Sequence, residues 1–386
     1  MKRILILTVF AAFCLGLNAQ KKKYDVAAFV WPAYHNNEPR FADVGVFKDG
    51  KGEWEAVYDA KPKFEGHRQP RTPLWGYLDE SDPKTQEKVI KTALEYGVNT
   101  FIFDWYWYDN RPFLENVLNE GFLKAKNNKK MKFYLMWANH TMTAYMDPKN
   151  PNKNQVYWQG EVSREIFDGF TDHLIEDYFK RPNYYKIDGK PVFAIYEVST
   201  FVKGMGGDKQ AKEALEGFNK KCIDAGLPGV HFQAILWQVP ATSGGPNDQK
   251  TQDNTIKYFE FESLTHYQWC HYVPTNQDYQ LWGEQAVAKY PEFSQFSVPY
   301  YPHVSISWDP NPRFPTGTYP CVSGVTPEKF EHFLKIAKEY VDTHPNQTPL
   351  ITINAWNEWA EGSYLEPDTE YKYGFLEAVK KVFLQK

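Results

Sequence analysis

Short apolar runs recur along the chain, and segments with helical spacing of apolar residues lie between many of them. Eight runs stand out, at residues 26–30, 100–103, 132–137, 191–196, 231–236, 258–261, 304–307 and 350–353. Each is short and mostly apolar, as expected for parallel strands that are covered on both faces. The pattern therefore predicts a (β/α)8 TIM barrel with long loops at its C-terminal face.

Helix signals fit between these runs. Asp82 and Pro83 supply an N-cap and a first-turn residue, and Gly97 marks the end of the same apolar stripe. Comparable stripes predict helices around residues 114–122, 166–174, 211–222, 327–337 and 375–383. The stretches 35–80 and 238–300 fit the alternation poorly. We interpret them as long loops or small insertions beside the mouth of the barrel.

The amino terminus has the pattern of a secretory signal peptide. A basic start is followed by an uncharged apolar run at residues 4–17 and a small-residue cleavage site that ends at Ala19. The run is shorter than the ~20 residues of a membrane-spanning helix. Phe13 before Cys14 disfavours a lipoprotein site. We expect residues 1–19 to be a cleaved signal peptide, residues 20–386 to form a single catalytic barrel domain, and the protein to be secreted or periplasmic.

Charge and cysteine content exclude some partners and leave other questions open. The net charge is −4, and the basic residues are scattered, so neither nucleic acid nor an acidic membrane surface is an expected partner. No segment after the leader is apolar enough to span a membrane. Cys222, Cys270 and Cys321 form either one disulfide or three thiols; we favour thiols, because a core of this size needs no covalent staple. No metal or cofactor motif is found, and the oligomeric state stays open.

Aromatic residues make up 17% of the chain and gather where predicted strands end. In TIM barrels the active site lies at these strand ends. Aromatic rings beside carboxylates suit an oligosaccharide or polysaccharide substrate, because rings stack on sugar faces and carboxylates move protons. The candidates for stacking are Trp31, Tyr34, Trp105, Trp107, Trp137 and Trp308. The candidates for binding hydroxyl groups are His35, Asp104, Asn139, Glu197, Asp309, Arg313, Asn357 and Glu366, the last of which alternatively holds its loop.

The last predicted strand runs directly into Glu358 and Glu361, the candidate catalytic residues. After a turn into helix, two residues three apart lie on one face with Cβ atoms ~5–6 Å apart. Retaining glycosidases hold their carboxyl groups ~5–5.5 Å apart, and inverting enzymes hold them ~6.5–9.5 Å apart. The spacing is therefore compatible with retention. The alternative for each glutamate is a helix cap or a pair with an arginine.

Residues 353–368, with the sequence INAWNEWAEGSYLEPD, resemble the hallmark segment of the WbsX-type family, also called glycoside hydrolase family 99-like proteins. Residues 28–35, 96–107, 136–139, 188–196 and 308–313 resemble the same family, so the likeness spans most of the chain. It implies a (β/α)8 barrel. The related endo-α-mannosidases cleave α-linked mannosides with retention through two glutamates.

The resemblance also implies separate roles for the two glutamates. Glu358 would deprotonate the 2-hydroxyl of the sugar, which attacks the anomeric carbon and gives an epoxide-like intermediate. Glu361 would protonate the leaving oxygen and then activate water. We therefore expect burial and Glu358 to raise the pKa of Glu361, while Glu358 stays charged.

Two departures from the hydrolase pattern keep the substrate open. Ala360 stands where the hydrolases usually have His, and the loop after Gly362 differs. Many WbsX-type proteins are described as glycosyltransferases of surface-polysaccharide synthesis. Three interpretations follow: an exported retaining hydrolase of an α-linked glycan, a glycosyltransferase-like protein, and a non-catalytic glycan-binding barrel. The leader favours the first, because a nucleotide-sugar donor is cytoplasmic, and the paired glutamates disfavour the third.

Overall fold

The computed structural model describes residues 23–36, 38–48, 50–237, 239–240, 248–314 and 316–385. The predicted signal peptide lies outside these residues, so it stays a prediction. Within the described part of the chain, every helix is too short or too polar to cross a lipid bilayer.

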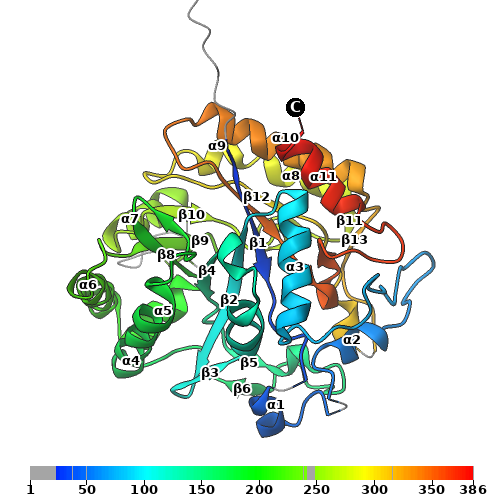
Figure 1. Ribbon diagram of the computed structural model, residues 1–386, viewed down its shortest axis with the longest axis horizontal. Helices are drawn as coiled ribbons and strands as arrows, with labels where there is room; N and C mark the ends of the chain where they lie inside the picture. Colours follow the sequence, from blue (N-terminus) through cyan, green and yellow to red (C-terminus); the bar gives the residue numbers. More distant parts are fainter. Residues whose placement is uncertain are drawn as a thin grey trace, which may run out of the picture.

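Eight parallel strands form the barrel (Figure 1). They are β1 (Asp25–Val30), β2 (Thr100–Tyr108), β4 (Lys132–Trp137), β8 (Lys190–Ile195), β9 (His231–Ile235), β10 (Ser263–Thr265), β12 (His303–Ser305) and β14 (Leu350–Asn354). Their order in the sheet is β10-β9-β8-β4-β2-β1-β14-β12. A parallel bridge between Leu264 and Tyr300, just before β12, joins the two ends. The predicted TIM barrel is confirmed, with a nearly closed sheet.

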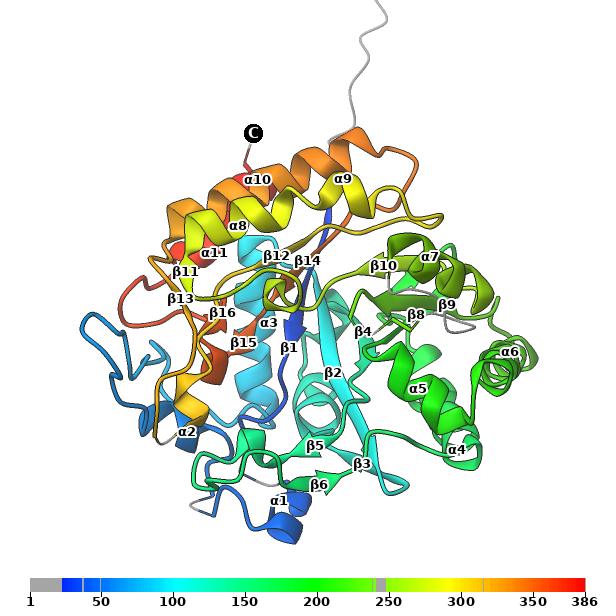
Figure 2. The same cartoon turned by 180° about the vertical axis from the view of Figure 1, so that it is seen from behind.

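Helices cover the outside of the barrel. They are α1 (Pro39–Val44), α2 (Trp54–Tyr58), α3 (Pro83–Tyr96), α4 (Arg164–Leu174), α5 (Val198–Met205), α6 (Asp208–Asp224), α7 (Gln249–Tyr258), α8 (Tyr279–Val287), α9 (Tyr290–Phe293), α10 (Pro327–Thr343) and α11 (Gly374–Phe383). As predicted, the Asp82 side chain caps α3, which ends at Gly97 with a φ of 99°. Helix α10 packs against both α8 and α11 on one side of the barrel (Figure 2).

The loops between the barrel strands and helices contain further short strands. They are β3 (Arg111–Phe113), β5 (Met142–Thr143), β6 (Val156–Trp158), β7 (Lys186–Ile187), β11 (Gln277–Asp278), β13 (Val322–Ser323), β15 (Asn357–Glu358) and β16 (Ser363–Tyr364). The helix expected around residues 114–122 is instead a single π-helical turn, Val117–Gly121, followed by a 3-10 turn, Phe122–Lys124.

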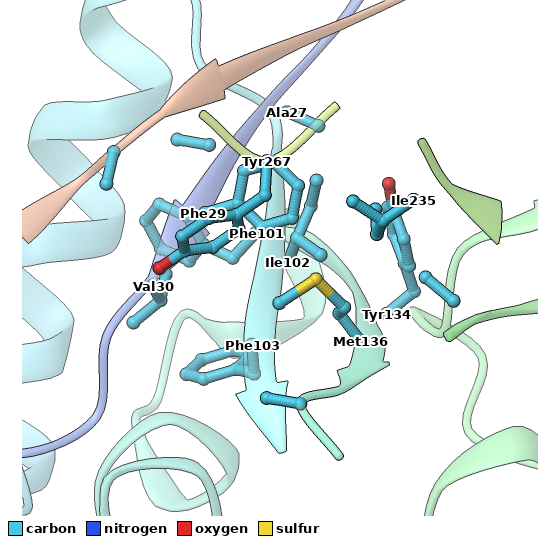
Figure 3. Packing of buried hydrophobic residues seen from close by; sticks show 14 of the residues in the cluster. Ala27, Phe29, Val30, Phe101, Ile102, Phe103, Tyr134, Met136, Ile235 and Tyr267 are labelled. Carbon is cyan, nitrogen blue, oxygen red and sulfur yellow. The ribbon is translucent and has the colours of Figure 1, made fainter. Parts of the chain in front are cut away.

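The barrel interior combines aromatic and polar side chains. Phe29 from β1 packs edge-on against Tyr267, with ring centroids 4.8 Å apart (Figure 3). Nearer the strand starts, Thr352 contacts Thr265 at 2.8 Å and His303 at 2.9 Å. All of these residues are buried, and the hydrogen bonds satisfy polar groups that would otherwise cost free energy inside the barrel.

The prediction of a strand at residues 258–261 is wrong, because this segment is the end of α7 and a turn. The sixth strand lies at residues 263–265. Its Ser263 contacts His231 at 2.8 Å and accepts a hydrogen bond from Gln233 at 3.2 Å. Two of its three residues are polar, so it lacks an apolar run, whereas Phe259 and Phe261 are apolar because they are buried at the helix end.

The interpretation as loops holds for only one of the two stretches that fitted the strand–helix alternation poorly. Residues 238–300 are not a loop insertion, since they contain β10 and helices α7, α8 and α9. Residues 35–80 are mostly loop with the short helices α1 and α2, as interpreted. Glu53 in this loop contacts Arg313, which lines the cavity at the barrel mouth.

Candidate active site

A cavity of about 720 Å³ opens at the C-terminal ends of the strands. Among its lining residues are seven of the predicted site residues: Trp31, Asp104, Glu197, Trp308, Arg313, Glu358 and Glu361. Two loop segments, 141–154 and 308–319, also contribute to the wall. We call them the first arm and the second arm. The cavity therefore lies where TIM-barrel active sites lie.

Strand β2 shows why three tryptophans predicted to stack on sugars do not line the cavity. Asp104 and Tyr106 face the cavity, and side chains alternate along a strand. Trp105 and Trp107 therefore face the other way, where their rings lie 5.3 and 5.9 Å from Phe170. On β4, Trp137 packs against Phe170 in the same manner, at 5.0 Å. These three stacking predictions are wrong, and the tryptophans belong to the layer between strands and helices.

Tyr34 and His35 also lie outside the cavity. Tyr34 is fully buried, its ring lies 4.1 Å from that of Trp54, and its hydroxyl accepts a hydrogen bond from the backbone N–H of Ala360 at 3.0 Å. His35 is buried against Phe41. The predicted contacts of both residues with a sugar are wrong, because the chain after β1 turns inward below the loop that carries α2.

Asn139, Asn357 and Glu366 hold the backbone rather than the cavity wall. Asn139 bonds with the backbone N–H and C=O of Glu197, at 2.8 Å each. Asn357 does the same with Trp31, also at 2.8 Å each. Hydroxyl binding was the wrong prediction for both, since their amide groups are already occupied.

Glu366 accepts hydrogen bonds from two indoles of its own segment, Trp356 at 3.1 Å and Trp359 at 2.8 Å. Burial raises the pKa of Glu366 to about 7. Of the two roles considered for this residue, holding the loop is the one that the contacts show.

Asp309 lies in a buried cluster with His67 and Cys321, whose potential ligand atoms are within 4.8 Å of one another. However, Nδ1 of His67 accepts a hydrogen bond from the backbone N–H of Lys63 at 3.0 Å. Nε2 therefore carries the hydrogen and donates it to Asp309 at 2.9 Å, which leaves no ring lone pair for a metal. Gln69 donates to the same carboxylate oxygen of Asp309 at 2.7 Å. Asp309 thus stabilises the loops around the site, and its predicted hydroxyl contact is wrong.

The three cysteines are free thiols, as favoured from the sequence. Cys222 lies buried on α6, and burial raises its pKa to about 12. Such a thiol is inert at neutral pH.

Arg313 connects the two candidate catalytic glutamates. Its Nη1 donates to Glu361, its Nη2 donates to Glu358 at 3.4 Å, and its Nε donates to Glu53 at 2.7 Å. All four side chains are at least nine-tenths buried. One guanidinium group thus serves three carboxylates.

A second hydrogen-bonded group, the hydroxyl of Tyr267, also contacts Glu358. The hydroxyl of Tyr267 lies 2.8 Å from Asp104 and 3.3 Å from Glu358. Burial raises the pKa of Asp104 well above its usual range, and the charge of Glu361 adds to the rise. The site therefore concentrates more carboxyl groups than its single arginine neutralises.

The surroundings raise the pKa of both glutamates, but with different causes. Burial raises the pKa of Glu361, as expected, but the close contact with Arg313 counteracts it, and the charge that adds to the rise is Glu53. Burial and the charge of Glu361 raise the pKa of Glu358 well above its usual range. Because Arg313 lies closer to Glu361 than to Glu358, this arrangement does not by itself favour the charge on Glu358 that the sequence led us to expect.

Several cavity residues were missed by the sequence analysis. The alternation that points Asp104 inward would have identified Tyr106. Tyr145 and Lys153 come from the first arm, a loop with no periodic pattern, so no signal marked them. Tyr267 follows the strand whose position was mispredicted. Glu53 lies in a loop far from every predicted strand end.

The two arms meet in an aromatic cluster. Phe314 and Tyr319 of the second arm stack with ring centroids 3.5 Å apart, and Tyr145 of the first arm meets Phe314 edge-on at 5.5 Å. The ammonium group of Lys153 lies 5.4 Å from the centre of the Phe314 ring. Burial lowers the pKa of Lys153 to about 8. The arms thus add ring surface to the cavity wall, to which Tyr106 of β2 also contributes.

The fold and site together define a (β/α)8 barrel protein with paired, buried carboxyl groups at the C-terminal ends of its strands. Residues 26–379 match the family model described as "Glycosyltransferase WbsX", and the chain belongs to this family. The chain is 25% identical over 376 residues to "Uncharacterized protein WxcX" of Xanthomonas campestris pv. campestris. That match covers 92% of this chain and 49% of the relative, so the chain spans about half the length of the curated relatives it matches.

Two solved structures share the fold. One, described as "Glycoside hydrolase-like protein", is 14% identical, covers 94% of each chain and superimposes with a TM-score of 0.59. The other is the GH99 endo-alpha-mannosidase from Bacteroides thetaiotaomicron, 14% identical, with 92% of this chain and 95% of that chain covered and a TM-score of 0.53. At these identities the likeness establishes the architecture alone.

Proposed function

We propose that the protein is an exported retaining glycoside hydrolase that acts on an α-linked glycan. The observation that carries the proposal is the contact of Glu358 and Glu361 with one guanidinium group, Arg313, at the wall of the cavity. A shared guanidinium holds the two carboxyl groups near one another, which is compatible with the spacing in retaining enzymes. The amino-terminal pattern supports export, and the fold of the endo-alpha-mannosidase supports the substrate class.

The proposed chemistry uses one proton on the pair. Glu361 donates it to the leaving oxygen while Glu358 takes the proton of the 2-hydroxyl, whose oxygen forms the new bond to the anomeric carbon. Water then opens this intermediate, with the proton transfers reversed. The step needs the proton on Glu361 at the moment of cleavage, although Arg313 lies closer to Glu361 than to Glu358 before a sugar binds.

The family description favours a second candidate, a glycosyl transfer reaction. A transferase would use the same two carboxyl groups, but a sugar hydroxyl would replace water as the acceptor. The two candidates therefore differ in product: a hydrolase releases a reducing sugar, whereas a transferase gives a longer glycan.

The test is product analysis on a panel of α-linked microbial, fungal and plant polysaccharides, comparing the wild type with Glu361→Gln. We expect reducing ends from the wild type alone, with the α-anomer detected first by NMR. Longer products would favour the transferase. No product from any glycan, with equal binding by both proteins, would identify a glycan-binding barrel instead.

Substrate assistance gives a separate prediction. A 2-deoxy analogue of the cleaved sugar has no O2 to attack the anomeric carbon, so we expect its turnover to be at background level although it binds. The control is a 3-deoxy analogue, which keeps O2 and should turn over. Normal cleavage of the 2-deoxy analogue, followed by single-turnover kinetics, would exclude the 2-hydroxyl mechanism and leave Glu358 as a direct nucleophile.

A further inference from the structure

Glu53 is a fully buried carboxylate that reaches the site from outside the cavity lining. It accepts hydrogen bonds from Nε1 of Trp31 and, at 2.7 Å, from Nε of Arg313. It therefore binds Nε of the guanidinium group, whereas the two terminal nitrogens bind Glu361 and Glu358. No part of the reaction proposed above uses Glu53.

The local backbone explains how Glu53 arrives there. Gly52 has a φ of +60°, and a Cβ at this position would lie 2.2 Å from the backbone oxygen of His35 and 2.5 Å from that of Ala33. Glu53 itself donates its backbone N–H to Ala33 at 3.1 Å. The loop thus packs closely against the segment after β1, and this packing places the side chain of Glu53 next to Arg313.

Two aromatic rings also lie beside the guanidinium group. The Trp31 ring centre lies 5.6 Å and the Tyr145 ring centre 5.2 Å from the central carbon of Arg313. With Glu53 on one edge and rings beside it, the remaining two nitrogens are directed at the catalytic pair. This arrangement fixes where the positive charge sits between Glu358 and Glu361.

We propose that Glu53 is a positioning residue, which anchors Arg313 between Glu358 and Glu361 and whose negative charge keeps one proton on this pair at neutral pH. Without Glu53, one guanidinium would face two catalytic carboxylates and would hold both ionised more easily. With Glu53, the same positive charge is divided among three buried carboxylates, and the surplus negative charge favours retention of a proton.

The charge balance around the pair supports this role. Glu53 raises the pKa of both Glu358 and Glu361. The other titratable or charged groups that act on the pair are Arg313, Asp104, Tyr34, Tyr106, Tyr145, Tyr196, Tyr267 and Cys270. Of these, burial keeps the tyrosines and the thiol neutral, so the fixed charge is set by Arg313 and the carboxyl groups.

This role rests on the proposed function for its kinetic effect, and Glu53→Gln tests it. The substitution keeps the shape and removes the charge, so we expect the alkaline limb of the kcat/KM–pH profile to move to lower pH by about one unit or more. The matched control is Glu55→Gln, two residues further along the chain in the first turn of α2. Glu55 is equally buried but pairs with Lys149, so its removal should leave the profile where it is.

Glu53→Asp separates charge from position and is informative if Glu53→Gln folds poorly. It keeps the negative charge but is one methylene too short to hold Arg313, so we expect a lower kcat with the alkaline limb nearly unmoved. A direct measurement is the titration of ¹³Cδ-labelled glutamates by NMR, with Glu358→Gln and Glu361→Gln for assignment. In Glu53→Gln the titration midpoints of the pair should fall.

The outcomes distinguish this inference from the proposed function. A wild type that cleaves a glycan, with a folded Glu53→Gln whose pH profile and NMR midpoints are unchanged, overturns the role of Glu53 alone. A wild type that cleaves nothing, with NMR midpoints that fall in Glu53→Gln, overturns the hydrolase proposal and keeps the role of Glu53 in setting the protonation of the pair.

Discussion

Replacing Glu361 with Gln is expected to lower kcat/KM on an unactivated glycan by about 10²–10⁴-fold, the range typical of a lost general acid. The amide fills the same space beside Arg313, so the dissociation constant for the glycan should stay nearly unchanged. Product release and isothermal titration calorimetry measure the two effects separately.

The leaving group then separates the roles of the two glutamates. An aryl glycoside with a strongly acidic phenol needs no proton on its leaving oxygen, so Glu361→Gln should recover most of the first step. Glu358→Gln should not recover it, because the 2-hydroxyl still lacks its base. If the recovery appears in Glu358→Gln instead, the assignment is reversed and Glu358 is the acid, in agreement with its higher proton affinity in this arrangement.

Replacing Arg313 with Met is expected to have the largest effect on stability. The change leaves three carboxyl groups buried together without their counter-ion, and breaking a buried pair typically costs about 3–5 kcal/mol of unfolding free energy. Urea unfolding followed by tryptophan fluorescence measures this loss. The control, Arg164→Met, breaks a half-exposed pair with Asp168 on α4 and should cost no more than about 1 kcal/mol.

The cost of Arg313→Met should also depend on pH, with a defined sign. The folded-state pKa values of Glu358 and Glu361 are raised above their unfolded values, so ionisation of these groups destabilises the fold as the pH rises. Loss of Arg313 raises both pKa values further. The difference between wild type and variant should therefore be larger at pH 8 than at pH 5. A constant difference would show that the lost packing of the side chain, rather than its charge, sets the cost.

The parts of the fold that follow a single periodicity were predictable from the sequence. Seven of the eight barrel strands coincide with apolar runs, and the cap residues of α3 fix both of its ends. The strand that was missed, β10, is buried although two of its three residues are polar, because these polar side chains are hydrogen-bonded inside the barrel. An apolar run therefore does not mark its position. Its partners on β9 become visible only once the sheet is assembled.

The site was predictable to the extent that strand ends meet at one edge of a barrel. This argument brought Asp104, Arg313, Glu358 and Glu361 together correctly around one cavity. It failed where orientation decides, as for Trp105, because the strand extends five residues beyond the predicted end, to Tyr108, and its alternation continues. The position of Glu53 could not be predicted from strand ends, because it depends on how a loop packs against the segment after β1.

Ala360 lies beside the carboxyl pair but outside the lining of the cavity. This residue, at which the chain departs from the hydrolase pattern, is fully buried, and its backbone N–H is bound by Tyr34. A change there alters packing behind the carboxyl pair and leaves the cavity wall as it was. The two arms, by contrast, form part of the cavity wall, so changes in them, away from Arg313, would alter the surface that a sugar meets. Relatives with the same glutamates can therefore be expected to divide into groups by their arms, each suited to a different polysaccharide.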